Sequence, residues 1–301
     1  MTQPGAASFS GAGTSGAAGR LGEAGDPAIL AAAARDAEEA GQAARVQVVE
    51  VTSLSDAQAA EHVAQNVWGP AIGAKADLVR ALANAGTAAL IARDLDAPGS
   101  PAIGFALGFI GWRGGMHLHS HQVAVLEAAR GRGVGPALKL AQRVDCLRHG
   151  IAAIRWTYDP LIAKNARLNL VRLGARVVAF LPDFYGQMAD MINAHDRSDR
   201  FEVEWRLDVP VPRGPWTGVT PVGPVLGVDE NGWPLRVGEI RPGATVRIPP
   251  DYATLRASGD PRARGWRQAT GEVFAKAFDA GLTVAGFQDD GYVLGVEADR
   301  G

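Results

Sequence analysis

The chain has 301 residues, enough for one or two domains with a hydrophobic core that needs no disulfides or structural metals to be stable. Its 30 basic and 32 acidic residues nearly cancel, which argues against nucleic acid as a partner. The single cysteine, Cys146, is expected to pack in the core, and no apolar run is long enough for a membrane span or a signal region, so we expect a cytoplasmic protein without a membrane partner.

The N-terminal part divides into two segments. Residues 1–26 are mostly glycine, alanine and serine with little to bury, so we expect a disordered tail. Residues 27–45 are strong helix formers behind Asp26, a suitable cap, and predict a helix. No catalytic group is expected in either segment.

Alternating strand and helix patterns follow from residue 46 to residue 208. Ser55 can cap the first helix of this region, and Gly174 can end its last helix, over residues 165–173. In chain order the pattern predicts a strand from 47, helices over 56–69 and 76–85, strands over 87–95, 102–112 and 119–125, a helix to Gly150, a strand over 152–160, the helix over 165–173, and strands over 175–181 and 200–208.

The sequence RGRGVG, from Arg130 to Gly135, lies between a strand and a helix. Backbone N–H groups at a helix N-terminus lack intrahelical partners and carry partial positive charge, so such a turn can hold a pyrophosphate. A dinucleotide GxGxxG loop is excluded because residue 136 is proline, and a P-loop because GK[ST] is absent. Candidate contacts to the phosphates are Arg130, Gly131, Arg132, Gly133, Val134 and Gly135.

The pattern R-x-x-G-x-G, at Arg130, Gly133 and Gly135, resembles motif A of the GNAT superfamily of acyl-CoA-dependent N-acyltransferases. The resemblance covers residues 46–208, whose elements come in that superfamily's order. It implies an α/β (α+β) fold with a mixed, mostly antiparallel twisted sheet, splayed central strands and flanking helices. It also implies that the thioester of acyl-CoA lies beside Val123 and Val125. The alternative is an ordinary strand, turn and helix with arginines for solubility.

A narrower resemblance concerns the donor. The stretches SHQVAV and WTYDPL are similar to those of a mostly uncharacterised GNAT subfamily with S-H-x-hydrophobic and W-T-[FY]-D-P-L motifs, some relatives of which are linked to N-succinylamino acid metabolism. This implies acetyl-CoA or another acyl-CoA, succinyl-CoA included, as cosubstrate, with no metal. The implied acceptor is a small-molecule amine, such as an amino acid.

Three alternating histidines, His117, His119 and His121, open the strand before the turn, and period two predicts that they share a face with Val123 and Val125. Acyl transfer to an amine needs a base, and imidazole is well matched. The spacing resembles serotonin N-acetyltransferase, where two histidines act through water. We therefore expect His121 first and His119 second as general base, with His117 solvated. The alternative is a polar strand rim.

A general acid is harder to assign. Many GNAT enzymes carry a tyrosine where this chain has Leu170, which leaves Tyr158 and Tyr185, although each can be a packing residue. A thiolate can also leave unassisted, because a thiol pKa lies near 8.5. Asp159, before a proline, is expected to be a turn residue rather than a catalytic carboxylate.

Other polar residues have two interpretations each. Asn165 can bond the pantetheine arm, sharing a helix face with Asn169, or can cap its helix. Arg155 can meet an acidic acyl group or lie on the surface. A third set can contact CoA phosphates or form a solvated face: Lys139, Arg143 and Arg172.

The acceptor pocket is expected among the helix connection at Trp68 and Gly69, the turn at Trp112 and the loop with Tyr185. Residues 209–301 predict a small C-terminal α+β subdomain, with a linker over about 209–225, then a strand, an amphipathic helix and a hairpin turning at 290–291. This subdomain is either a degenerate half-repeat of the first domain or a cap that extends the sheet or makes a homodimer contact.

The sequence therefore predicts a GNAT-type N-acyltransferase that moves an acyl group directly from acyl-CoA to a primary amine. The alternative is a non-catalytic CoA-binding or scaffold protein with a degenerate GNAT fold.

Overall fold

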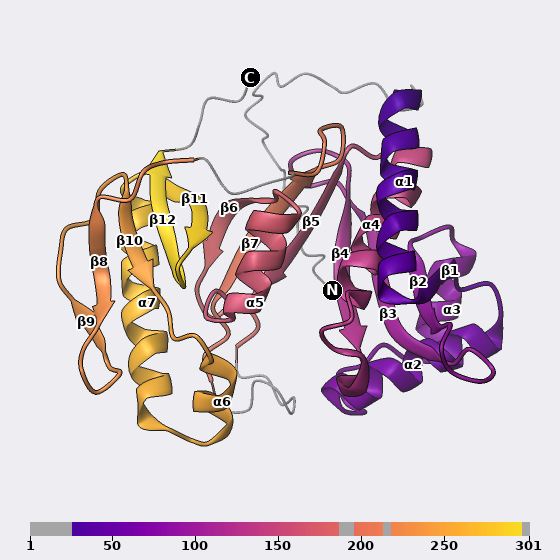
Figure 1. Ribbon diagram of the computed structural model, residues 1–301, viewed down its shortest axis with the longest axis horizontal. Helices are drawn as coiled ribbons and strands as arrows, with labels where there is room; N and C mark the ends of the chain where they lie inside the picture. Colours follow the sequence, from indigo (N-terminus) through magenta and orange to yellow (C-terminus); the bar gives the residue numbers. More distant parts are fainter. Residues whose placement is uncertain (1–25, 187–195, 213–217, 297–301) are drawn as a thin grey trace, which may run out of the picture.

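The structure is a computed structural model that describes residues 26–186, 196–212 and 218–296. The predicted disordered tail lies outside the described residues, apart from Asp26. Two sheets stand next to each other, one of seven strands and one of five, with helices packed against them (Figure 1). None of the helices in the described ranges is long and apolar enough to cross a membrane.

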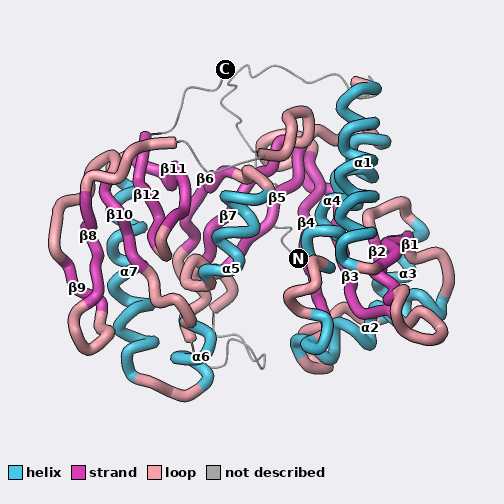
Figure 2. Tube along the Cα trace, viewed as in Figure 1, coloured by secondary structure: helices cyan, strands magenta, loops and turns pink. Residues whose placement is uncertain are grey.

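The predicted N-terminal helix is confirmed as α1 (Pro27–Ala44). Asp26 caps it, because its carboxylate accepts the N–H of Ala28 at 2.8 Å. The helix lies against α4 (Val134–Arg148), and together they cover one face of the seven-stranded sheet, called here the α4 face (Figure 2).

The opposite face of the sheet, called here the α2 face, is covered in its first half by α2 (Leu54–Trp68). The predicted cap Ser55 is wrong. Ser53 caps α2 instead, because Asp56, three residues on, accepts the Ser53 N–H while the Ser53 hydroxyl accepts the Asp56 N–H. The other elements of this half are β1 (Val46–Glu50), α3 (Ala76–Asn84), β2 (Ala89–Asp94), β3 (Ala102–Gly111) and β4 (His117–Val125).

The second half begins with a short turn of 3₁₀ helix, η1 (Glu127–Ala129), and α4. The single α-helix predicted over 165–173 is wrong in form: a short α5 (Ala163–Ala166) continues as the π-helix η2 (Arg167–Arg172) and ends at Gly174, whose φ is 71°. The strands of this half are β5 (Ala153–Tyr158), β6 (Arg176–Leu181) and β7 (Arg200–Arg206).

The strand order of the first sheet is β1-β2-β3-β4-β5-β7-β6. Its described strand pairs are antiparallel except β4 with β5, which are parallel and share only the pairs Leu118 with Ile154 and His119 with Arg155. Beyond those residues the two central strands part. The predicted mixed, mostly antiparallel sheet with splayed central strands is therefore confirmed.

The elements of the C-terminal part are β8 (Gly223–Val228), β9 (Pro234–Arg236), β10 (Ala244–Arg247), α6 (Tyr252–Ala257), α7 (Pro261–Asp279), β11 (Leu282–Gln288) and β12 (Gly291–Val296). Its strands form the second sheet, in the order β11-β12-β10-β8-β9. Because β12 lies between β10 and β11, this order does not match the consecutive β1 to β4 of the first sheet, so the predicted half-repeat is wrong. No described strand pair joins the two sheets, so the predicted extension of the first sheet is also wrong.

Two local predictions in this part need correction. β8 begins at Gly223, inside the predicted linker. The last hairpin turns one residue earlier than predicted, at Asp289 and Asp290, whose φ values are 47° and 55°. The boundary near residue 208 and a homodimer contact stay predictions.

One hydrophobic core joins the C-terminal part to β5, β7 and β6. The fully buried Phe201 of β7 lies 4.7 Å from Phe274 of α7 and 5.3 Å from Tyr292 of β12, measured between ring centroids. Such aromatic contacts stabilise the folded state by more than the burial of their apolar area alone. The C-terminal part therefore supports the strands that carry the predicted site.

A chain ending at Asp208 should consequently not fold cooperatively, because Phe201 would lose α7 and β12 and face water. Thermal melts followed by circular dichroism check this expectation. A truncated protein that melts in one transition at the parental temperature would show that the C-terminal part gives no such support.

Candidate active site

The glycine-rich turn begins α4 with an open backbone. Gly131 and Gly133 have φ values of 84° and 96°, which glycine adopts at little cost, and Gly133 is the N-cap. A Cβ on Gly135, in the first helical turn, would meet no atom within 4 Å. Within the described residues, no hydrogen bond is donated by the backbone N–H groups of Gly131, Gly133, Val134 and Gly135. The turn therefore presents free donors at the positive end of a helix.

The two arginines of the turn differ in role. Arg132 contacts both carboxylate oxygens of Asp94, at 2.8 and 2.9 Å, and holds the pKa of that carboxyl at about 2. It ties the turn to the end of β2, and its charge is neutralised. Arg130 is exposed and forms no ion pair with any described residue. Arg130 is thus the better candidate for an incoming anion.

A β-bulge in β4 overturns one prediction. The register with β3 shifts between Leu107 and Gly108, so that Gln122 faces Leu107 while Ser120 faces Gly108, and His121 is the extra residue. Alternation restarts at this point. Val123 and Val125 pack on the α4 face, whereas the histidine rings gather at Phe109 on the α2 face. The predicted shared face is therefore wrong.

His119 and His121 form a cluster with Phe109. Ring centroids lie 5.1 Å apart for Phe109 and His119, and 5.6 Å apart for Phe109 and His121. Burial lowers the pKa of His119 to about 4, helped by the charges of His121, His117 and Lys139. Partial burial beside Phe109 also lowers the pKa of His121, the more exposed of the two. Both rings are thus biased toward the uncharged form, which a base requires.

His117 is buried, not solvated as predicted, and its Nδ1 lies 2.8 Å from the carbonyl oxygen of Gly115. Its position on the α2 face under the turn between β3 and β4 leaves it packed instead of facing water.

Three segments on the α2 face are each tied by hydrogen bonds to β4 or β5. The Gln122 side chain bonds the connection between α2 and α3, at Ile72 and Ala74, and Thr157 lies 3.2 Å from the hydroxyl of Tyr185. Arg155 donates to the carbonyls of Arg113 and Gly114 in the turn that contains Trp112. These are the three segments predicted for the acceptor pocket.

The predicted pocket residues themselves differ in exposure. Trp112 is 79% exposed and Tyr185 43% exposed, so both rings are available to a ligand, whereas Trp68 is half-buried against the core under α2. Sequence patterns did not identify Gln122 or Thr157, because a polar residue in a strand gives no signal of the loop that it binds.

The candidate general acid Tyr158 lies on the α4 face, since it alternates with Trp156, which contacts α4. It is buried and packs edge-on against Phe201, and burial raises its hydroxyl pKa above the ordinary value. The hydroxyl therefore stays protonated, as an acid must be, but the structure does not bring it to the histidines.

Asn165 does not cap its helix, because α5 begins two residues earlier with Ile162 as its N-cap and without a side-chain cap. Asn165 is half-buried, and Asn169 is buried within the π-helix. π-Helical turns are frequent at functional sites. The predicted contact with a pantetheine arm stays a prediction.

The surroundings of Arg143, Lys139 and Arg155 do not fit the ligand contacts predicted for them. Arg143 is 1% exposed and donates to the carbonyls of Leu207 and Val209, and Lys139 is also buried, so neither the predicted phosphate contact nor a solvated face is correct. Arg155 is paired with Glu204 at 2.5 Å, which neutralises the charge that an acidic acyl group would need. Arg172 is exposed.

Asp159 and Cys146 are both buried. Burial alone would raise the pKa of Asp159, but the charges of Arg267 and Arg200 hold this pKa below its ordinary value. Burial raises the thiol pKa of Cys146, as expected for a packing residue.

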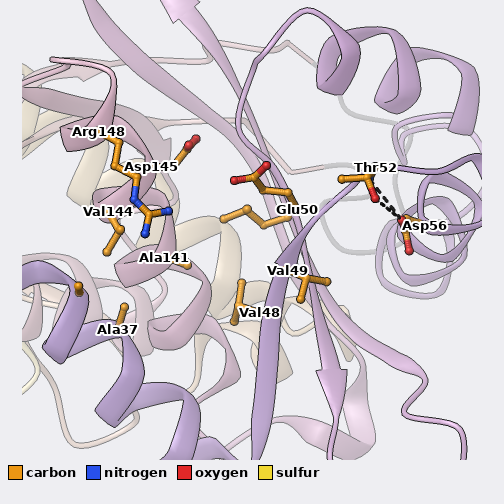
Figure 3. A pocket seen from close by; sticks show the side chains of 12 residues that line it. Ala37, Val48, Val49, Glu50, Thr52, Asp56, Ala141, Val144, Asp145 and Arg148 are labelled. Atoms are coloured by element: carbon orange, nitrogen blue, oxygen red, sulfur yellow. Dashed lines mark hydrogen bonds between the residues drawn. The ribbon is translucent and has the colours of Figure 1, made fainter.

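A groove of about 580 Å³ lies elsewhere, between α1, β1 and the C-terminal half of α4 (Figure 3). Its walls are mostly small and apolar, with Glu50, Asp145 and Arg148 among them, and one end holds the bond from Thr52 to Asp56. Neither the glycine-rich turn nor the histidines line it, so this groove is separate from the candidate site.

No protein-family model and no curated protein matches the chain. Solved structures similar to it include a ribosomal-protein alanine N-acetyltransferase from Escherichia coli (13% identity, 57% of this chain and 99% of that chain, TM-score 0.44). Another is yncA, a putative acetyltransferase from Salmonella typhimurium with its cofactor acetyl-CoA (17% identity, 56% of this chain and 98% of that chain, TM-score 0.42). A third is a putative GNAT-family acetyltransferase from Desulfovibrio desulfuricans (17% identity, 54% of this chain and 99% of that chain, TM-score 0.41). At such identities and TM-scores, evidence for function must come from the geometry of the chain itself.

Proposed function

We propose that the protein is an acyl-CoA-dependent N-acyltransferase of GNAT type. The observation that carries the proposal is the open turn at the start of α4, with its free N–H groups, directly after the strand that parts from its neighbour. Phosphates of acyl-CoA would bind the N–H groups of the turn, with Arg130 beside them. The acyl chain would run along Val123 and Val125 between the parted strands, near Asn165.

The amine would approach from the α2 face, in a pocket bounded by Trp68, Trp112 and Tyr185. His121 or His119 would take a proton from the ammonium or from the tetrahedral adduct, and the lowered pKa of both rings favours the basic form at neutral pH. Tyr158 is the candidate acid for the departing thiolate. Acyl-CoA on the α4 face and the amine on the α2 face would thus meet in the gap between β4 and β5, as direct acyl transfer requires.

Acetyl-CoA and succinyl-CoA both remain candidate donors, and the acceptor is proposed to be a small primary amine such as an amino acid. The pairing of Arg155 with Glu204 gives no support to Arg155 as the group that recognises a succinyl carboxylate. A cytoplasmic location and a homodimer are further parts of the proposal.

A panel of amines, incubated with acetyl-CoA or succinyl-CoA and analysed by mass spectrometry, tests the proposal. We expect an enzyme-dependent mass increase of one acyl group on at least one amine. Binding of CoA with no acylated product from any amine would favour the non-catalytic CoA-binding alternative.

A further inference from the structure

Lys139 of α4 lies at the point where β4 and β5 part. The last paired residues are His119 and Arg155, and the next residue on each strand contacts the same ammonium group. Lys139 Nζ donates to the hydroxyl of Ser120 at 2.7 Å and lies 3.7 Å from the ring centroid of Trp156. One side chain therefore bridges both strands at the vertex of the splay.

This lysine is costly to the folded state. It is 4% exposed, and no ion pair with it occurs in the described part of the chain. The Ser120 hydroxyl donates onward to Gln142, whose Nε2 is buried without a partner among the described residues. Burial lowers the pKa of Lys139 to about 7. An apolar side chain of similar length would avoid this cost, and such expensive polar groups cluster at functional sites.

The charge of Lys139 also reaches the α2 face. Ser120 follows His119 in β4, and the Lys139 ammonium is one cause of the lowered pKa of His119, after burial and the charges of His121 and His117. The other groups facing His119 are the Phe109 ring and Arg155, whose charge is matched by Glu204. Cys146, which faces Lys139 from its own helix, holds an uncharged thiol because burial raises its pKa.

We propose that Lys139 is a positioning residue, which holds Ser120 and Trp156 at the vertex of the splay, next to His119. The proposal rests on the proposed function in taking His119 as part of the site. Lys139 touches no reacting atom; it acts through the bulged strand and through its charge.

Histidine titrations by NMR, with no substrate present, test the proposal independently of turnover. When His119 titrates, Lys139 is protonated and repels the imidazolium, so Lys139→Met should raise the His119 midpoint by about half a pH unit. Lys276→Met, which removes an exposed lysine of α7, should leave the midpoint unchanged. An unchanged midpoint in Lys139→Met would overturn the proposal. Lys139→Met should fold, because methionine has a similar length and its apolar side chain avoids the cost of burying an ammonium group that has no ion pair among the described residues.

Kinetics with the best acceptor of the amine panel give a second readout. Ser120→Ala keeps the ammonium but removes its acceptor, so kcat should fall by about tenfold to hundredfold while the KM for acyl-CoA is unchanged. Parental kcat in both Ser120→Ala and Lys139→Met would overturn the positioning role. If the parent acylates no amine, the proposed function fails, and the NMR titration still decides the role of Lys139.

Discussion

His121→Ala should lower kcat by about 10²- to 10⁴-fold, the range that general-base assistance supplies. Affinity for acyl-CoA should change little, because the glycine-rich turn lies beyond the bulge at the other end of β4. If His119 relays the proton through water, replacing His119 should lower kcat by less than replacing His121. The fall in kcat of the double variant should then be smaller than the product of the two single effects. The matched control is His149→Ala, which removes an exposed histidine at the end of α4.

The pH dependence follows from the same residues. A base works in its uncharged form, so kcat/KM should fall as the pH drops through the pKa of the base, which burial has moved below the ordinary histidine value. The parent should thus stay active at pH values where an exposed histidine is already charged. Near-parental rates in both single variants, with an unmoved acid limb, would show that the histidines are only a polar strand rim.

Arg267→Met should lower the free energy of unfolding by about 3–5 kcal/mol. Arg267 of α7 binds both oxygens of Asp159, at 2.9 and 2.6 Å, and also contacts Asp196 at 2.8 Å. The side chains of Asp159 and Asp196 are only 7% and 9% exposed, so removing the guanidinium leaves both carboxylates without their main partner in a largely dry environment. Chemical denaturation of the full chain measures the loss.

The control is Arg206→Met, which breaks an exposed pair with Asp208 and should cost no more than about 1 kcal/mol. The Arg267 effect should also depend on pH. The pKa of Asp159 is lowered in the folded state, so its stabilisation is present above the ordinary aspartate pKa and is lost as the pH falls through the folded value. The difference in the free energy of unfolding between the parent and Arg267→Met should therefore become smaller at acidic pH. An equal loss in the free energy of unfolding for Arg267→Met and Arg206→Met would contradict the stabilising role of the contacts that Arg267 makes with the two aspartates.

Local signals in the sequence predicted much of the fold. Three local signals depend only on neighbours in the chain, and the elements that they predicted were confirmed: Asp26 before Pro27, the glycines around Arg130, and the β-branched and aromatic residues of β5. The cap of α2 was misplaced by two residues because Ser53 and Ser55 look alike, and only the reciprocal bond to Asp56 separates them.

The errors at the site arise from tertiary structure. The bulge at His121 depends on the register with β3, so strict alternation assigned Val123 and the histidines to one face. The partners of Lys139 and Arg143 come from β4, β5 and the chain after β7, and a sequence pattern cannot tell a buried cation from a solvated one. Asp159 likewise meets Arg267 across more than a hundred residues.

The central claim, that the turn before α4 binds acyl-CoA through its backbone, is tested most directly by calorimetry. The parent should bind acetyl-CoA or succinyl-CoA, and Gly135→Leu should weaken binding by at least about 100-fold, because a side chain would occupy the space that the phosphates need. Gly135 is the sharpest position, since its Cβ would meet no protein atom, whereas Gly133 needs positive φ. Ala28→Leu, at the equivalent position of α1, is the control and should bind as the parent does. Unchanged affinity in Gly135→Leu, or no binding by the folded parent, would contradict the account.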